Sequence, residues 1–385
     1  MRGTGPANYN TGSKCQRGSQ SGSRLVDHRR TSAVICSHLQ SADICGHRTA
    51  DNVFILRTLV DQAKANINVK KRKLYTCFVD FSKAFDTIPR GLLWHRLEQL
   101  GVTGRFLEAV KGMYSKVEVA IKTRAGILAR RFESTLGVKQ GCPLSPTLFG
   151  LYIDELEALL QKGGCDAPRL AGIMAIVLLY ADDIVLISET AAGLQKQLTL
   201  LGQFCAAKGL TVNLTKTKVL VFNARKPPVE QFLYQGQPLE KVMQYKYLGI
   251  EFHATKGYAA AAEKLAGSAQ RACHALHKRC EELHITSPKQ RCELFDALVM
   301  PVLTYCSEAW CVSFCCPKDT EQADRKNMWN DLERVHKEFL RRVLMVRKCT
   351  AREAILAEFG RFPLRLRWLE HALKVLQQAS SVAKQ

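Results

Sequence analysis

Three aspartates stand where an apolar, strand-like run of residues stops, and carboxylates in such positions can hold divalent cations. In TCFVDFSKAFD the run ends at Asp80, and in LLYADDIVLIS the adjacent pair Asp182 and Asp183 interrupts such a run. Two-metal phosphoryl transfer needs carboxylates from separate strands to hold two Mg²⁺ ions about 3.5 to 4 Å apart. If the two strands are neighbours, the three carboxylates converge and their mutual repulsion requires a cation.

The pair Asp182 and Asp183 also has a simpler interpretation. A strand pattern interrupted by two polar residues predicts a β-hairpin with the pair at or near its tip. Aspartate is common in turns, because its side chain hydrogen-bonds the local backbone and tolerates unusual backbone angles. Taken alone, LLYADDIVLIS therefore fits an ordinary turn, and the rest of the chain has to decide between a turn and a metal site.

The residues around these aspartates predict an α+β unit. Apolar residues at helical spacing predict helices over 52–66, 91–100, 146–161 and 194–209, the second of them opened by Pro89 and closed by Gly101. Strands are predicted over 74–81, 117–123, 173–180, 184–188, 218–224 and 245–252. Antiparallel strands with the helices on one side form an α+β fold.

The chain divides into three parts. Residues 1–45 are rich in Gly, Ser, Thr and Arg without periodicity, which predicts a disordered basic leader. Residues 46–255 hold the α+β unit, and helices dominate over 256–385, where RRVLMVRK and RFPLRLRWL are strongly basic. Basic residues beside aromatics suit a groove that follows a nucleic-acid backbone, and a solvated helix face explains them equally well.

The composition favours a nucleic-acid partner. The 385 residues carry 56 Lys and Arg against 35 Asp and Glu, a formal net charge of +21, which attracts polyanions, with an anionic membrane as the weaker alternative. No apolar run reaches the roughly 18 residues of a membrane span, and MRGTGPANYN lacks the apolar core of a signal peptide. Fifteen cysteines without a secretory signal predict reduced thiols in an intracellular protein, nuclear or cytoplasmic.

A cluster of Cys and His in RACHALHKRCEELH has two explanations. Cys273, His277, Cys280 and His284 recur at helical spacing, so a helix would carry all four on one face. One straight helix cannot surround a zinc ion tetrahedrally, so a metal site would need ligands from elsewhere. We favour a helix face that is rich in Cys and His, and we interpret CVSFCC at 311–316 as packing.

Five motifs occur in order along the chain: FVDFSKAFDTIP, QGCPLSPTLFGLYIDEL, YADDIVLIS, GLTVNLTKTKVLVF and YKYLGIEF. In this order they resemble the palm of reverse transcriptases, most closely those of non-LTR (LINE-type) retrotransposons. MPVLTYCSEAW and LERVHKEFLRRVLMV resemble the thumb of the same enzymes, although Cys306 stands where a glycine is usual. Over about residues 46 to 365 the resemblance implies a right-hand polymerase palm with partial fingers and a helical thumb.

The resemblance also implies which residues do the chemistry. Asp80 and Asp182 would ligate both Mg²⁺ ions, with Mn²⁺ as a possible substitute, while Asp183 is the less direct third carboxylate and the carbonyl of Phe81 a further ligand. Lys216 resembles a lysine near the triphosphate that could protonate the pyrophosphate leaving group. The neighbouring Lys218, or a plain solvated basic turn, is the alternative to that role.

Further residues match the positions that hold the substrates. Phe85 would lie under the sugar, where a phenyl ring clashes with a 2′-hydroxyl and selects dNTP over rNTP. Its other explanation is core packing. Gln140 and Gly141 would lie against the incoming nucleotide and the template, and Gly allows a close approach. The hairpin residues Tyr247, Leu248 and Gly249 would grip the primer end.

The upstream part departs from the family pattern. ICGHRTADNVFILR resembles the end of the fingers, but residues 1–45 do not resemble what should precede them, and we do not assign Arg48 to the triphosphate. We therefore expect an N-terminally truncated element. The expected function is an RNA-directed DNA polymerase that extends a DNA primer on an RNA template with dNTPs. The alternatives are an inactive relic that only binds nucleic acid, and an RNA-templated RNA polymerase, which Phe85 disfavours. The sequence does not predict the oligomeric state.

Overall fold

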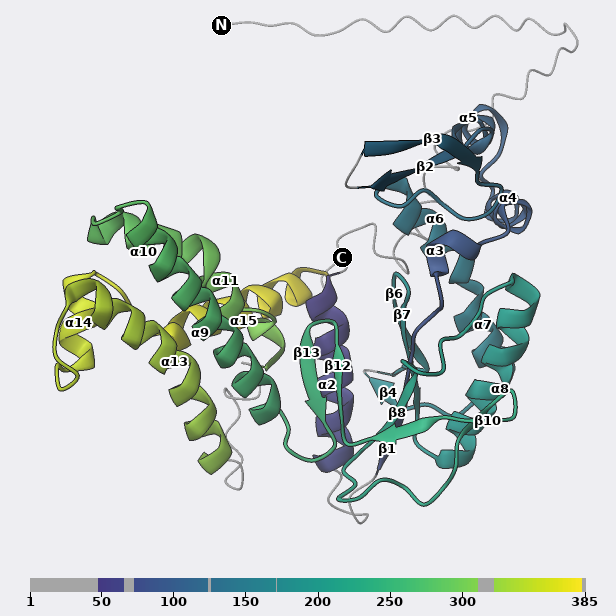
Figure 1. Ribbon diagram of the computed structural model, residues 1–385. Helices are drawn as coiled ribbons and strands as arrows, with labels where there is room; N and C mark the ends of the chain where they lie inside the picture. The colour runs from purple at the N-terminus through teal and green to yellow at the C-terminus, as the bar shows by residue number, and fades with distance from the viewer. Residues whose placement is uncertain (1–47, 66–72, 124–125, 171, 311–321, 383–385) are drawn as a thin grey trace, which may run out of the picture.

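A computed structural model describes residues 48–65, 73–123, 126–170, 172–310 and 322–382 (Figure 1). The expected leader over 1–45 and the CVSFCC stretch at 311–316 lie outside these described residues. The elements divide into a central sheet with its covering helices, a smaller part around the β2–β3 hairpin, and a helical region at the C-terminal side (Figure 1).

The central sheet has five strands. Their order is β11-β8-β1-β7-β6, and neighbouring strands run antiparallel except for the parallel pair β11–β8. The strands are β1 (Leu74–Val79), β6 (Val177–Tyr180), β7 (Asp183–Ser188), β8 (Lys218–Phe222) and β11 (Glu240–Val242). The predicted α+β fold with an antiparallel sheet is therefore confirmed, with the middle strand β1 between β7 and β8.

Both faces of this sheet are covered, which differs from the expected one-sided arrangement. All six residues of β1 are buried, so alternate side chains enter two different cores. Tyr75, Cys77 and Val79 pack in a core that also holds residues of three helices, α6 (Leu144–Ile153), α7 (Glu155–Lys162) and α8 (Ala191–Lys208). Leu74 and Phe78 pack in a second core with α2 (Thr49–Ala65) and with elements that follow the sheet. A strand with no polar face requires such a second cover.

The part around β2 and β3 follows directly on β1. It consists of α3 (Ala84–Thr87), α4 (Arg90–Gln99), α5 (Gly104–Tyr114) and a hairpin of β2 (Glu118–Thr123) with β3 (Gly126–Glu133). Pro89 precedes α4 and Gly101, with φ 81°, follows it, as the sequence predicts. The expected strand over 173–180 is split into β5 (Ile173–Met174), which pairs with β4 (Arg169–Leu170), and β6.

Two further hairpins and the helical region complete the structure. The hairpins are β9 (Leu233–Tyr234) with β10 (Gln237–Pro238), and β12 (Gln244–Tyr247) with β13 (Ile250–His253). The helices are α9 (Ala259–Glu282), α10 (Pro288–Leu298), α11 (Met300–Leu303), α13 (Gln322–Leu344), α14 (Arg352–Glu358) and α15 (Leu364–Val382). In the described residues after 256 every element is helical, as expected.

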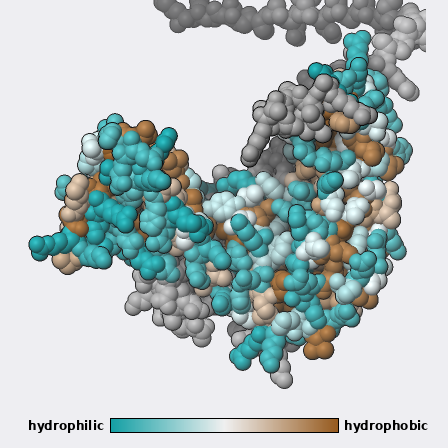
Figure 2. Space-filling view, viewed as in Figure 1, coloured by the Kyte–Doolittle hydropathy of each residue, from teal (hydrophilic) through white to brown (hydrophobic). Residues whose placement is uncertain are grey.

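The helical region and the sheet share one hydrophobic core. Trp310 and Trp368 of the helical region belong to the same buried cluster as Phe78 of β1 and Leu56 of α2. The helical region is therefore packed onto the sheet and α2. Figure 2 shows that the surface is hollowed between the helical region and the part around β2–β3, and that the visible face of the helical region is mostly hydrophilic.

Candidate active site

The aspartate pair lies at the tip of the β6–β7 hairpin. Tyr180 pairs with Asp183 at the end of the ladder, so Ala181 and Asp182 form a two-residue turn and Asp183 begins β7. Ala181 has φ 49°, a left-handed conformation that is uncommon for a residue other than glycine and is found at turns and functional sites. The predicted hairpin is confirmed.

The pairing of β1 with β7 brings the third aspartate to this tip. Val79 is opposite Ile184 in the antiparallel register, so one residue further along Asp80 lies opposite Asp183. Side chains alternate along a strand, which puts Asp80 on the face of Phe78 and Asp183 on the face of Val185. Phe78 and Val185 belong to the same core. The three aspartates therefore gather at one end of two neighbouring central strands.

The electrostatics show that these carboxylates interact. Partial desolvation, and then the negative charges of Asp182 and Asp80, raise the pKa of Asp183 to about 6. Tyr245 of β12 lies close to the same cluster. Burial of its hydroxyl, and then the negative charges of Asp183 and Asp80, raise the pKa of Tyr245 to about 12. Its ring stacks on Phe78 with centroids 4.3 Å apart. Sequence reasoning missed Tyr245, although it lies in the quoted motif YKYLGIEF.

The loop before β8 holds the backbone of Asp80. The amide of Asp80 donates to Oγ1 of Thr217 at 3.2 Å, and the amide of Asn213 donates to the Asp80 carbonyl at 2.8 Å. Next along the chain, Phe81 and Val212 form an antiparallel bridge. The two hydrogen bonds around this bridge use the carbonyl of Asp80 and the amide of Ser82, and neither uses the carbonyl of Phe81. The end of β1 is thereby fixed from the side opposite to β7.

The carboxyl of Asp80 has a feature typical of a metal ligand. Its Oδ2 is buried, and within the described residues no group forms a hydrogen bond with it. The ammonium of Lys216 lies 3.6 Å from it. A buried, unsatisfied carboxylate oxygen is costly, and a bound cation would remove that cost. The nearby Lys218 is paired with Glu240 instead.

The three aspartates do not form a ready-made metal site in this structure. In the part of the chain that the structure describes, no group of three His, Cys, Asp or Glu side chains is arranged so that it could hold a metal ion.

The Cys and His cluster of RACHALHKRCEELH is covered by the same finding, so its described residues do not form a metal site. Cys273 and Cys280 are buried in α9, and His277 packs against Phe339 with ring centroids 5.4 Å apart. The helix ends at Glu282, so the expectation that His284 shares its face is wrong.

The predicted nucleotide-binding residues come from two segments that contact each other. Phe85 is half-buried, with its ring 5.1 Å from that of Phe149 between centroids. The side-chain amide of Gln140 donates to both carboxyl oxygens of Asp86, at 2.9 and 3.1 Å. Gly141 is exposed, has φ +78°, and has open space where a side chain would lie. The structure thus brings Phe85, Gln140 and Gly141 to one region, and Asp86 is a contact that sequence reasoning missed.

The loop that carries Gln140 is fixed by a glycine and an arginine. Gly137 has φ +76°, and a side chain there would collide with the carbonyl oxygens of Phe85 and Asp86 at 2.6 Å. Only glycine allows so close an approach of two backbones. Arg90 donates to the carbonyls of Gly137, Leu136 and Tyr114. This residue was also missed, because nothing in the sequence around it indicates such a role.

The predicted primer-grip residues occupy the turn of the β12–β13 hairpin. Tyr247 pairs with Ile250, and Leu248 and Gly249 between them have φ 44° and 82°, as in the tight turns that suit the twist of a hairpin. Tyr247 is only 2% exposed and lies 5.5 Å from Phe78 between ring centroids. In this structure the tip residues Leu248 and Gly249, and not the Tyr247 ring, are the ones available to a ligand.

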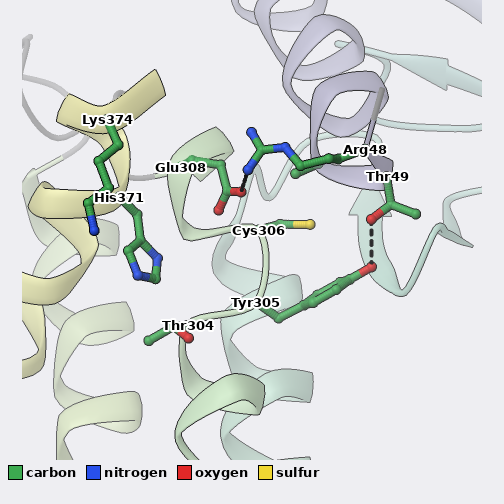
Figure 3. A pocket seen from close by; sticks show the side chains of 9 residues that line it. Arg48, Thr49, Thr304, Tyr305, Cys306, Glu308, His371 and Lys374 are labelled. Carbon is green, nitrogen blue, oxygen red and sulfur yellow. Dashed lines mark hydrogen bonds and ion pairs between the residues drawn. The ribbon is translucent and has the colours of Figure 1, made fainter. Parts of the chain in front are cut away.

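Arg48 directly precedes α2. It is paired with Asp51 and Glu308, and it lines a pocket of about 430 Å³ between the start of α2, residues 304–308 and α15 (Figure 3). These pairs account for the arginine without a triphosphate. We therefore leave it unassigned.

An antiparallel sheet whose central strands end in converging aspartates, flanked by a helical region, defines the palm of a right-hand nucleic-acid polymerase. A family model described as reverse transcriptase (RNA-dependent DNA polymerase) matches residues 15–252. This is more than half of the chain, and the chain belongs to that family of RNA-directed DNA polymerases. The match begins at residue 15, inside the segment expected to be a leader, so the family likeness extends further upstream than the motifs had placed it.

Relatives of the chain include Pol polyproteins of retrotransposable elements. The chain is 26% identical to the Pol polyprotein of the retrotransposable element R2 of Popillia japonica, over 68% of this chain and 36% of that protein. It is 30% identical to the Pol polyprotein of element R2DM of Drosophila melanogaster, over 54% of this chain and 20% of that protein. The chain thus matches about a third or less of the length of these relatives.

Solved structures similar to this one include a telomerase. The telomerase of Candida albicans, in complex with a fragment of telomeric RNA, aligns with a TM-score of 0.44 and 12% identity, covering 83% of this chain and 54% of that one. Within the described residues of the present chain, no helix combines the length and the apolar character needed to cross a membrane.

Proposed function

We propose that this chain extends the 3′-hydroxyl of a DNA primer on an RNA template with dNTPs, as the reverse transcriptase of a non-LTR retrotransposon. The observation that carries the proposal is the register of β1 and β7, which puts Asp80 opposite Asp183 beside the turn that holds Asp182. The net charge of +21 suits the polyanionic template and primer. The similarity to Pol polyproteins of R2 elements supports the same activity.

The donor set of this site suits two divalent ions, Mg²⁺ or Mn²⁺. Asp80 and Asp182 would hold both, with Asp183 and the carbonyl of Phe81 as further ligands. Such ions, when bound, activate an attacking hydroxyl and stabilise the leaving oxygen. The buried Oδ2 of Asp80 accepts no hydrogen bond within the described residues, and the exposed ammonium of Lys216 lies 3.6 Å from it. The raised pKa of Asp183 supports the same proposal. The fit is therefore one of donor chemistry.

The remaining residues would bind and orient the substrates. Phe85 and the loop with Gln140 and Gly141 would enclose the dNTP, with the phenyl ring against C2′ of the sugar. Lys216 would hold a proton at Nζ close to the leaving pyrophosphate. The tip of the β12–β13 hairpin would support the primer end. In Figure 1 the tips of β6–β7 and β12–β13 both point toward the top of the view, so the primer end and the carboxylates can share one side of the sheet.

Primer extension by the purified chain tests the proposal. The substrate is a labelled DNA primer on an RNA template, with dNTPs and Mg²⁺ or Mn²⁺. We expect extension by the unchanged chain and its loss, by at least a hundredfold, in the double variant Asp182→Asn, Asp183→Asn. The variant Asp331→Asn, which changes an aspartate of α13 far from the site, is the matched control and keeps full activity.

The alternative function gives a different result in the same experiment. A chain that only binds nucleic acid would show no extension, with or without the aspartates, and its affinity for RNA would fall steeply with salt. Use of rNTPs as readily as dNTPs would instead indicate an RNA polymerase. Either result, obtained with a protein shown to be folded by its cooperative thermal transition, overturns the proposal.

A further inference from the structure

Tyr305 lies where three segments far apart in the sequence meet. Its hydroxyl is 2.8 Å from the carbonyl oxygen of Leu248 at the tip of β12–β13. A carbonyl can only accept, so Tyr305 is the donor. Oγ1 of Thr49, the first residue of α2, lies 3.4 Å from the same hydroxyl, on the line drawn in Figure 3. One side chain thus joins the chain after α11, the β12–β13 turn and the start of α2.

The ring of Tyr305 also covers the turn. A side chain at Gly249 would come within 3.0 Å of Cε1 of the ring. Gly249 therefore allows the ring to lie against the backbone of the turn, and its φ of 82° is a conformation that other residues rarely adopt. The Tyr305 hydroxyl and ring together restrict both residues of the turn, Leu248 and Gly249.

Two tryptophans of the helical region fix the backbone around Tyr305. The indole of Trp310 donates to the Tyr305 carbonyl at 3.0 Å, and the indole of Trp368 in α15 donates to the Leu303 carbonyl at 3.0 Å. The two indoles meet edge to face, with centroids 5.0 Å apart. Cys306 has φ 51°, which reverses the chain directly after Tyr305. The position of the Tyr305 side chain is thus set by helices that are distant from the carboxylates in the sequence.

The same hairpin is tied to the carboxylate site through its first strand, β12. Phe78 lies two residues before Asp80 in β1, and its ring packs on both Tyr245 and Tyr247 of β12, with centroids 4.3 and 5.5 Å apart. Strand β12 is therefore held by β1 up to Tyr247 beside the turn, and the turn itself is held by Tyr305. A shift of the tip relative to Asp80 requires the loss of one of these two attachments.

We propose that Tyr305 is a positioning residue for the polymerase reaction, which holds Leu248 and Gly249 at a fixed place relative to Asp80 and so couples the helical region to the primer end. This inference rests on the proposed function of the hairpin tip as the support of the primer. Tyr305 itself contacts neither substrate nor reacting atoms. It acts by keeping the primer end at a fixed position relative to the carboxylates.

The variant Tyr305→Phe tests the inference, with Tyr258→Phe as its matched control. Tyr258 is buried in the shared core, against which the half-buried Tyr305 packs, and its hydroxyl likewise donates to a carbonyl, that of Ala309, at 3.2 Å. Each variant loses one hydroxyl and one hydrogen bond to a carbonyl, and Tyr305→Phe also loses the longer contact with Thr49, so small losses of stability are expected in both. Only Tyr305→Phe releases the hairpin tip. We expect it to raise the KM and the Kd for primer–template about three- to tenfold, with kcat nearly unchanged.

Hydrogen–deuterium exchange of the peptide 245–252 gives a readout that does not depend on activity. We expect faster exchange in Tyr305→Phe and unchanged exchange in Tyr258→Phe. Unchanged exchange in Tyr305→Phe overturns the inference, as does faster exchange without any change in primer–template affinity, or equal effects of both variants. If the unchanged chain does not extend a primer, the proposed function fails separately, and exchange together with primer–template Kd still decides whether Tyr305 holds a primer support.

Discussion

The ammonium of Lys216 lies 3.6 Å from the buried Oδ2 of Asp80, whereas the ammonium of Lys218, two residues further on, is paired with Glu240. Lys216 is also 66% exposed, so its side chain can turn from Asp80 toward a bound triphosphate. Lys218 lies in β8, with its side chain largely covered. The structure therefore separates two lysines that the sequence left as alternatives.

We expect Lys216→Ala to lower the rate of single-turnover nucleotide incorporation about a hundredfold, because the proton for the leaving pyrophosphate is lost. The affinity for primer–template should change little. Lys218→Ala is the matched control and should keep nearly the full rate, since it removes only a partly exposed ion pair. Rapid-quench kinetics with both variants make the comparison, and equal losses would contradict the role of Lys216.

The raised pKa of Asp183, about 6, predicts how stability depends on pH without metal. The folded protein binds this proton more tightly than the unfolded chain, in which aspartate titrates near 3.8. The stabilisation is thus fully present below about pH 4 and is lost as the pH rises through about 6. Asp183→Asn should therefore raise the melting temperature of the metal-free protein at pH 7.5. Because Asp183 is exposed, solvent screening limits the gain to about 1 kcal/mol.

Metal addition and a control variant complete this test. The gain from Asp183→Asn should shrink as the pH falls toward 4, and Mg²⁺ should raise the melting temperature of the unchanged chain more than that of the variant. Glu263→Gln, on the exposed face of α9, removes a negative charge elsewhere and should give no gain. A gain that is the same at pH 4.5 and pH 7.5 would refute the electrostatic origin.

The position of Phe85 leads to a prediction about the choice between dNTP and rNTP. Its ring packs on Phe149 yet remains half-buried, so one side is available to a nucleotide. Phe85→Val should increase the efficiency of rNTP use relative to dNTP about ten- to a hundredfold, since the smaller side chain no longer clashes with a 2′-hydroxyl. Phe204→Leu in α8, a core change away from the site, should lower stability without altering selectivity. Competition between dNTP and rNTP in primer extension measures the ratio, and unchanged selectivity would favour plain packing for Phe85.

Cys306 is strained, and this gives a stability prediction. It is buried with φ 51°, a conformation that costs an L-residue about 1 to 2 kcal/mol. We expect Cys306→Gly to be more stable than Cys306→Ala by about 1 kcal/mol. In the middle of α9, by contrast, Ala269→Gly should lose about 1 kcal/mol relative to alanine. Chemical denaturation measures the free energy of unfolding of all three variants. A Cys306→Ala variant that is more stable than Cys306→Gly would contradict the strain.

The sequence predicted the elements whose local pattern is strong and missed those whose pattern is weak. Strands β1, β7 and β8 were predicted because their apolar, β-branched runs are continuous. Strand β3 was missed, since GILARRFE is interrupted by two arginines, and β11 was missed because three residues carry no periodicity. The one-sided placement of the helices was wrong. Whether a fully apolar strand is covered by one layer or two depends on packing partners distant in the sequence.

By itself the sequence determined which residues can do chemistry and that Asp182 and Asp183 stand at a hairpin tip, because motifs and strand alternation are local. Only the tertiary structure decided that Asp80 lies opposite Asp183, that Tyr245 faces their carboxylates, and that Lys216 rather than Lys218 faces Asp80. It also decided that Tyr305 reaches back to Leu248. These relationships depend on strand register and on helix packing, which join residues far apart in the chain and leave no periodic mark in the local sequence.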